Sequence, residues 1–362
     1  MAKKKIITKK SEAFLEKYLN NPSPTGFESG GQKMWLDYIS PYIDEHFVDT
    51  YGTVVGVINP EAKYKVVIEA HADEISWFVH YITKDGYIYL RRNGGSDHQI
   101  APSKRVNIHT KKGMVKAVFG WPAIHTRTAG TEKSPKLDNI FLDCGCASKE
   151  EVEELGIHVG CVVTYEDEFM ILNDKYYVGR ALDNRIGGFM IAEVARLLKE
   201  NKVTLPFGLY ITNSVQEEVG LRGAQMIVEN IKPDVAIVTD VCHDTGTPML
   251  DKIKQGDTKC GDGPVLTYGP AVQNNLLELI INAAKKNKIP FQRAAASRST
   301  GTDTDAFAYA TGGVASSLIS LALRYMHTTV ETVSKDDVEN VIRLIYESLQ
   351  KIKNNHDFRY LK

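Results

Sequence analysis

The chain of 362 residues has few cysteines, no excess charge of either sign and no long apolar run. Its five cysteines are odd in number and scattered, which argues against a disulfide framework and for a reducing compartment. Cys144 and Cys146 could hold a metal together, but no second pair at suitable spacing accompanies them. We therefore interpret all five as buried or incidental thiols.

The balance of charge excludes partners that bind mainly through a field of one sign. Lysine and arginine number 44 against 45 aspartates and glutamates, a net charge of -1. No overall field favours nucleic acid or an anionic membrane, so we expect small molecules or peptides as partners. The start, MAKKKIITKKSEAFLEKYL, lacks the apolar segment of a secretory signal, and no apolar stretch approaches the about 20 residues of a bilayer span. We expect a cytoplasmic protein.

Length and composition predict a globular chain of more than one unit. The sequence is 43% hydrophobic and 25% charged, which is ordinary for a chain that buries a large core. At this length two domains are more common than one. The sequence contains no internal repeat or low-complexity segment.

Most of the chain alternates between helical and strand patterns, which predicts an α/β fold with a mostly parallel sheet flanked by helices. Residues 11–43 predict two amphipathic helices around a Pro/Gly loop, with Ser11 as an N-cap. Strands are expected at 53–60, 64–71, 206–215, 234–241 and 315–323, and further helices at 186–202, 221–231, 274–290 and 334–353.

From about Ile75 the pattern changes to short strands separated by turn signals, which is typical of a small β-barrel or sandwich. We therefore predict one α/β domain, made of residues 1–74 and 169–362, that is interrupted by a β-rich insertion, residues 75–168. Ligands of open α/β sheets bind at the carboxyl ends of the strands. That edge of the larger domain is where we look for a functional site.

Side chains that can bind metals recur at this kind of place. Taken singly they are weak signals, because a histidine at a strand end is usually a satisfied polar residue, an aspartate before a helix is usually an N-cap, and paired glutamates usually face solvent. Taken together, two histidines and three carboxylates match a two-metal hydrolase site with one shared carboxylate, and zinc or cobalt suits that mixture better than magnesium. The positions are His71, Asp183, Asp240, His327 and the neighbouring pair Glu217 and Glu218, of which one would be the third carboxylate.

Six stretches of the chain resemble the M42 family of dinuclear metallo-aminopeptidases, also called TET peptidases. They occur in the family's order and span nearly the whole chain. The stretches are AHADEI (70–75), GRALDNRIGG (179–188), SVQEEVGLRGA (214–224), VTDV (238–241), GTDTDAF (301–307) and RYMHTTVETV (324–333). The resemblance implies a zinc-peptidase-like phosphorylase/hydrolase fold for the larger domain.

The resemblance also implies a role for each candidate side chain. His71 and Asp240 would hold one metal ion, Glu218 and His327 the other, and Asp183 would bridge both. Glu217 would be the general base, and the turn before it must aim both neighbouring glutamates inward, since adjacent side chains diverge on an extended segment. Asp73 is the candidate for orienting the His71 imidazole.

The implied activity is removal of N-terminal residues from short peptides with free N-termini by a metal-activated water. Two cations lower the pKa of such a water from 15.7 toward roughly 7, so that Glu217 can accept its proton and pass it to the leaving amine. The family also implies a cis peptide bond between Asp183 and Asn184. The chain departs from the family at Ser76 and Trp77, where glycine usually comes first, and this departure bears on the pocket wall.

Two other classes compete with the peptidase. A glycoside hydrolase of the endoglucanase type would use two carboxyls roughly 5–9.5 Å apart, which leaves the histidines and Asp240 unexplained. A non-catalytic binding protein on the same fold leaves the complete ligand set unexplained. The remaining histidines are expected to be structural or on the surface, with His125 the one that could reach an active site across a subunit contact.

The insertion is expected to serve assembly and to add little to catalysis by itself. In the resembling family it pairs subunits into dimers, and six dimers close into a hollow dodecamer. We therefore expect a homo-oligomer, with the insertion as its dimerisation domain. The alternative is a lid over the active site of a monomer or dimer.

Overall fold

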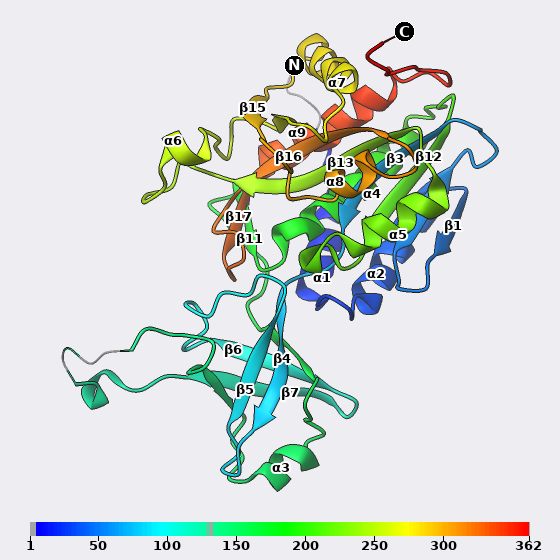
Figure 1. The fold of residues 1–362 in the computed structure, drawn as a ribbon. Helices are drawn as coiled ribbons and strands as arrows, with labels where there is room; N and C mark the ends of the chain where they lie inside the picture. Colours follow the sequence, from blue (N-terminus) through cyan, green and yellow to red (C-terminus); the bar gives the residue numbers. More distant parts are fainter. Residues whose placement is uncertain (1–4, 129, 131–132, 362) are drawn as a thin grey trace.

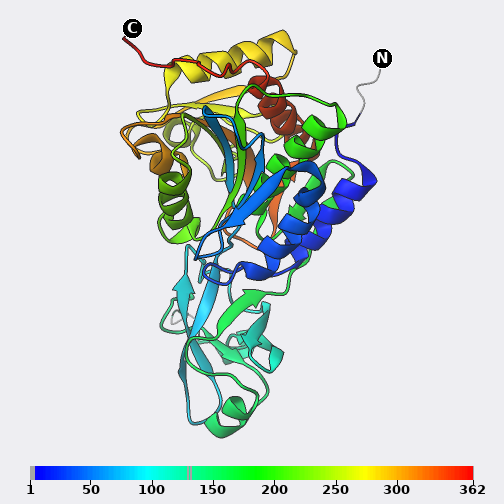
Figure 2. The ribbon, with the colours of Figure 1, turned by 90° about the vertical axis from the view of Figure 1, so that its right-hand side faces the viewer.

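The structure is a computed structural model that describes residues 5–128, 130 and 133–361. Residues 1–4, 129, 131–132 and 362, which fall within the expected domains, lie outside the described residues. The chain forms an α/β body with a smaller β-barrel standing off from it, joined by the segments around residues 75 and 168 (Figures 1 and 2). No helix in the described residues combines the length and apolar character that crossing a membrane requires.

An eleven-stranded mixed sheet runs through the body. Its main path has the order β1-β2-β12-β3-β13-β16-β17-β11-β10, while β14 pairs with β15 and β16. The strands are β1 (Glu45–Val48), β2 (Val54–Ile58), β3 (Lys65–His71), β10 (Met170–Leu172), β11 (Tyr176–Gly179), β12 (Gly208–Ser214), β13 (Val235–His243), β14 (Val265–Tyr268), β15 (Gln292–Ala295), β16 (Ala315–Arg324) and β17 (Glu331–Ser334).

Parallel pairing is concentrated at the centre of this sheet. Strands β12, β3, β13 and β16 run parallel in that order, so their carboxyl ends share one edge. The flanking strands pair antiparallel, because β1-β2, β10-β11 and β16-β17 are each joined by a short connection. The predicted α/β class is confirmed, with parallel pairing at the functional edge and antiparallel pairing at the flanks.

Helices cover both faces of the sheet (Figure 2). Helices α1, α2, α4 and α9 pack on one face, and α5 and α8 on the other, while α7 packs against α9 and β14. Their bounds are α1 (Lys9–Asn20), α2 (Ser29–Ile39), α4 (Leu182–Glu200), α5 (Arg222–Ile231), α6 (Lys252–Gln255), α7 (Asn274–Lys286), α8 (Thr304–Ala308) and α9 (Lys335–Leu349), with 3-10 turns η1 (Ser40–Tyr42) and η3 (Glu217–Val219).

The prediction that Ser11 is the N-cap of the first helix is wrong, because the cap lies about one turn earlier. Thr8 is the N-cap of α1, and its side chain accepts a hydrogen bond from the Ser11 backbone N–H. Ser11 itself is fully buried inside the helix. The sequence Thr-Lys-Lys-Ser offers two hydroxyls three residues apart. The helix face that carries Phe14 and Tyr18 packs against α2 and α4 and also buries Ser11, which leaves Thr8 as the cap.

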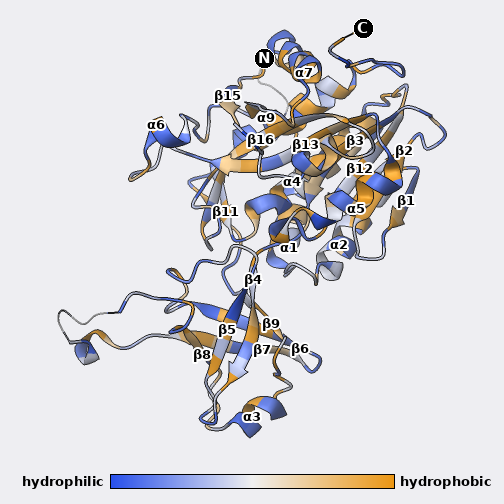
Figure 3. Cartoon of the chain, viewed as in Figure 1, coloured by the Kyte–Doolittle hydropathy of each residue, from blue (hydrophilic) through white to orange (hydrophobic). Residues whose placement is uncertain are grey.

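The core follows the strands. Apolar residues run through β3, β12, β13 and β16 and through the inward faces of α4 and α9 (Figure 3). Long β-branched runs such as Val66, Val67 and Ile68 are buried on both sides, as expected for central parallel strands. This packing holds the carboxyl ends of the strands rigidly at one edge.

The insertion is a closed six-stranded barrel with the order β4-β5-β8-β7-β6-β9. Trp77 and Phe119 meet edge to face in its separate apolar core. The strands are β4 (Ser76–Ile82), β5 (Ile88–Asn93), β6 (Arg105–Thr110), β7 (Gly113–Gly120), β8 (Phe141–Asp143) and β9 (Val162–Tyr165), with a short helix α3 (Lys149–Glu154) and a 3-10 turn η2 (Ile124–Thr126).

Candidate metal centre

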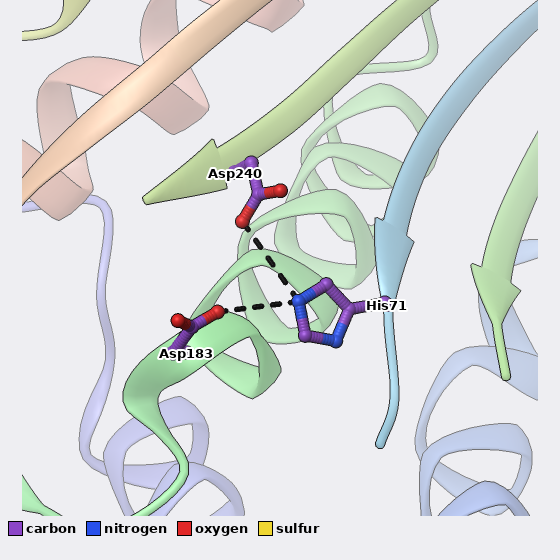
Figure 4. A group of neighbouring side chains, drawn as sticks. All are labelled: His71, Asp183 and Asp240. Carbon is purple, nitrogen blue, oxygen red and sulfur yellow. Dashed lines mark hydrogen bonds and ion pairs between the residues drawn. The ribbon is translucent and has the colours of Figure 1, made fainter. Parts of the chain in front are cut away.

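One group of possible metal ligands lies where β3, β13 and the start of α4 meet. His71 ends β3, Asp240 lies on β13, and Asp183 lies in a non-helical step at the start of α4, where the Asp183–Asn184 peptide bond is cis, as expected. His71 Nε2 is 3.2 Å from Asp183 Oδ1 and 3.9 Å from Asp240 Oδ1 (Figure 4). One donor atom from each residue lies within 4.8 Å of the others, which is close enough to share an ion.

A second group uses the other oxygen of the same aspartate. His327 Nε2 lies 3.3 Å from Asp183 Oδ2 and 3.4 Å from Glu218 Oε1. These three residues also offer one ligand atom each within 4.8 Å. Asp183 therefore stands between the two groups, with one carboxylate oxygen facing each histidine.

The turn that follows β12 explains how two adjacent glutamates both face inward. Gln216 has a left-handed backbone with φ 57°, and η3 begins directly after it. The carboxylate of Asp73 accepts the backbone N–H groups of Glu217 at 3.0 Å and of Glu218 at 3.2 Å. Glu218 thereby joins the second group, while Glu217 Oε2 lies 3.9 Å from His71 Nε2, outside both groups.

Asp73 also fixes the first histidine. Its Oδ1 lies 3.3 Å from His71 Nδ1, and its Oδ2 accepts a hydrogen bond of 2.8 Å from Thr25 Oγ1. A partner on Nδ1 leaves Nε2 of His71 directed at Asp183 and Asp240. Asp73 is fully buried, so one carboxylate sets both the imidazole and the turn of the glutamates.

Several buried carboxyls lie close together at the centre, and their pKa values are raised. Burial raises the pKa of Glu217 to about 10, with Asp240 and Asp303 adding to the effect and His71 opposing it. Burial likewise raises the pKa values of Asp240 and Glu218. Divalent cations at the two groups would stabilise the carboxylate forms and lower these pKa values.

The pKa values of the two histidines are raised as well, but here burial opposes the shift. Burial alone would lower the pKa of His327, but hydrogen bonds to Asp183 and Glu218 outweigh it and raise the pKa to about 11. Burial also opposes charge on His71, yet contacts with Asp183 and Asp73 raise its pKa well above the usual value. Each histidine thus directs its Nε2 at carboxylate oxygens, at Asp183 for His71 and at Asp183 and Glu218 for His327. The donor set, two imidazoles and three carboxylates, fits divalent zinc or cobalt.

Three buried carboxyls near the centre were missed by the sequence reasoning. Glu331 accepts the backbone N–H of His327 at 2.7 Å and that of Asp183 at 3.0 Å, so it ties the two ligand segments together. Glu69 and Asp303 lie fully buried beside one another, and burial raises the pKa of both. A carboxyl in the otherwise apolar stretch VVIEA and the first acid of TDTDAF were the available signals.

Ser76 and Trp77, where the chain departs from the family, are buried and do not themselves line the pocket beside the second group. Trp77 is fully buried in the barrel core, and Ser76 is 1% exposed. Beside the second group, a small pocket is lined by Ile75, Tyr165 and Thr328.

The other histidines and the cysteine pair lie elsewhere. His80 and His98 contact Arg91 and Arg92 of the barrel. His125 is exposed on η2, and none of the remaining histidines joins either ligand group within the described residues. Cys144 Sγ donates to Cys146 Sγ at 3.6 Å, and no third ligand joins them in the described part of the chain.

Comparison with known proteins shows similarity over nearly the whole chain. The sequence model of a family described as M42 glutamyl aminopeptidase matches residues 52–344. A lysyl aminopeptidase from Pyrococcus furiosus is 32% identical over 342 residues, which cover 94% of this chain and 96% of the relative.

Solved structures agree with the sequence comparison. A TET aminopeptidase from the marine sediment archaeon Thaumarchaeota archaeon SCGC AB-539-E09 superposes with a TM-score of 0.90 at 32% identity, over 95% of this chain and 97% of that one. The TET1 peptidase of Pyrococcus horikoshii, which can assemble into a tetrahedron or a large octahedral shell, gives 0.82 at 27% identity, over 93% and 98%.

Proposed function

Because the chain belongs to the M42 glutamyl aminopeptidase family and is an aminopeptidase, we propose that it works with two divalent metal ions, zinc or cobalt. His71 and Asp240 would hold one ion, Glu218 and His327 the other, and Asp183 would bridge them. The observation that carries this proposal is the placement of Asp183, whose two oxygens face the two histidines at 3.2 and 3.3 Å. No other cofactor is proposed.

When bound, such ions polarise the substrate carbonyl and make a water acidic enough to be deprotonated near neutral pH. Glu217 is placed to accept that proton, because it reaches the centre without belonging to either ligand group. It then delivers the proton to the amine that leaves when the first peptide bond breaks. Asp73 positions both His71 and Glu217 through the contacts described above.

The substrates proposed are short peptides with a free N-terminus. A site rich in carboxylates attracts the positively charged α-amino group, and the buried centre excludes bulky chains. The histidines at both groups have no role in glycoside hydrolysis or in a scaffold protein. These two classes therefore stay as alternatives to be separated by experiment.

The test is a metal count combined with an activity panel. Apo protein is reloaded separately with zinc, cobalt or manganese and assayed with aminoacyl-p-nitroanilides and, in parallel, with cello-oligosaccharides. We expect two ions per chain and metal-dependent release of nitroaniline. Cleavage of the oligosaccharide alone, or no turnover with any metal, would contradict the proposed function.

We also propose a homo-oligomer, a dodecamer built from dimers that pair through the barrel. The similarity to a TET1 peptidase that can assemble into a tetrahedron supports it, as does the position of the barrel away from the body (Figure 1). The cytoplasmic location expected from the sequence stays a prediction.

A further inference from the structure

The loop that follows β5 brings part of the insertion into contact with the second ligand group. The carbonyl oxygen of Gly95 lies 3.3 Å from Nδ1 of His327. A carbonyl can only accept a hydrogen bond, so Nδ1 must carry the proton. Nε2 of His327 is then the nitrogen directed at Asp183 and Glu218, and it is the one that would be free to bind a metal ion once it loses its proton.

The contact leaves no room for a side chain at Gly95. A Cβ built there would lie 2.4 Å from Nδ1 and 2.6 Å from Cε1 of His327. The φ of Gly95 lies outside the left-handed region, so the backbone itself does not require glycine. The close approach to the imidazole is therefore the reason for glycine at this position.

Buried hydrogen bonds hold the loop against β4, and one of them reaches the larger domain at Thr25. Ser96 Oγ donates to the Ser76 carbonyl at 2.6 Å, and Asn93 Nδ2 donates to Ser76 Oγ and to the Thr25 carbonyl, both at 2.8 Å. All four residues are less than one-tenth exposed. The serine that departs from the family pattern thus accepts a bond that fixes this loop.

His327 needs such external support because its side chain is 31% exposed. Its backbone is fixed by Glu331, which accepts its N–H, but this bond does not set the rotation of the ring. The insertion also contacts the adjacent segment, where Lys104 Nζ donates to Thr329 Oγ1 at 2.5 Å. Gly95 supplies the contact that orients the imidazole itself.

We propose that Gly95 is a positioning residue of the active centre, and that the insertion takes part in holding the second metal ion as well as in assembly. This inference rests on the proposed two-metal function. It replaces the expectation that the insertion adds little to catalysis. Partners of metal-binding histidines are typically worth about 10–100-fold in metal affinity.

The experiment measures zinc binding to Gly95→Ala, with Gly113→Ala as the matched control. Gly113 is also in the barrel and has a left-handed φ of 120° with nothing within 4 Å of an added Cβ, so its alanine strains the barrel backbone without meeting any side chain of the centre. We expect Gly95→Ala to bind one ion normally and the second about 10–100-fold more weakly. We expect Gly113→Ala to bind two ions like the wild type.

Thermal unfolding of the metal-free proteins separates this loss from misfolding, since Gly95→Ala should stay folded without metal. If it does not fold, Ser96→Ala loosens the same loop without adding atoms and should weaken the same single ion. If Gly95→Ala folds and binds both ions with wild-type affinity, the positioning role is overturned and the two-metal proposal is not. If Gly95→Ala does not fold, wild-type affinity for both ions in Ser96→Ala has the same meaning. A wild-type protein that binds fewer than two ions instead contradicts the two-metal proposal and this inference with it.

Discussion

Glu217 and Glu218 share one turn, yet their surroundings give them different chemistry. Glu218 lies 3.4 Å from His327 and belongs to a ligand group, whereas Glu217 approaches only His71, at 3.9 Å. A residue that must move a proton has to remain free of the ions. The turn held by Asp73 directs one glutamate into a ligand group and leaves the other outside both groups.

We predict that Glu217→Gln keeps both ions and lowers kcat by about 10²–10⁴-fold, because the amide cannot accept a proton. Metal content by mass spectrometry and kcat on an aminoacyl-p-nitroanilide are the measurements. Glu218→Gln is the control and should lose an ion. Near-normal kcat in Glu217→Gln with full metal occupancy rules out Glu217 as the base.

Glu28 is a second residue whose environment sets its behaviour. It is 3% exposed, and burial together with the charge of Asp73 raises its pKa from 4.5 to about 7. The folded state therefore binds more protons than the unfolded state between these two values. The free energy of unfolding falls as pH rises through this window, and the penalty is complete above it.

We predict that Glu28→Gln flattens this decline. The glutamine can still accept the Gly26 N–H at Oε1 but carries no charge, so the variant should gain up to about 3 kcal/mol relative to the wild type between pH 4.5 and pH 8. Urea unfolding of both metal-free proteins at several pH values measures it. A difference that is constant with pH would show that Glu28 does not titrate in this range.

At the scale of elements, the first helix depends on a cap that lies before its expected start. Thr8 has an extended backbone and accepts the Ser11 N–H at 3.1 Å, while the buried face of α1 carries Phe14, Leu15 and Tyr18. The helix thereby covers α4, whose start carries Asp183.

We predict that Thr8→Ala lowers the free energy of unfolding by about 1 kcal/mol through loss of this cap. Lys10→Ala is the matched control, because Lys10 is exposed in the same turn and should change stability by less than about 0.5 kcal/mol. Urea midpoints at pH 7 decide between them. Equal effects of the two variants would mean that Thr8 does not cap the helix.

At the scale of the whole molecule, the barrel stands apart from the body (Figures 1 and 2), yet it reaches the site through Gly95 and through Ile75 and Tyr165, which line the pocket there. Its loop after β5 meets His327. If the barrel also pairs subunits, as we propose, one insertion would serve both assembly and the metal centre.

We predict that light scattering after size exclusion gives a species of about twelve times the 40.3 kDa chain, since closed symmetry is the usual state of soluble homo-oligomers. The measurement is made at micromolar concentration of the metal-loaded protein. A stable monomer would contradict the proposed dodecamer. A dimer alone would agree with pairing through the barrel but contradict the assembly of six dimers.

The sequence by itself determined the fold class and the positions of the candidate ligands. Hydrophobic runs place the strands, and His71 and Asp240 stand at or near the ends of such runs, where parallel strands share an edge. The cis bond after Asp183 was implied by the resemblance of the stretch GRALDNRIGG to the family. These features depend on residues that are close together in the chain.

The tertiary structure alone decided the surroundings of those ligands. Glu331 meets the backbone of Asp183 across 148 positions, and Gly95 meets His327 across 232. The choice of Thr8 over Ser11 as a cap likewise depended on which face of α1 packs against the body. Periodicity records which side of an element is buried, but it carries no record of which distant backbone group comes to lie against it.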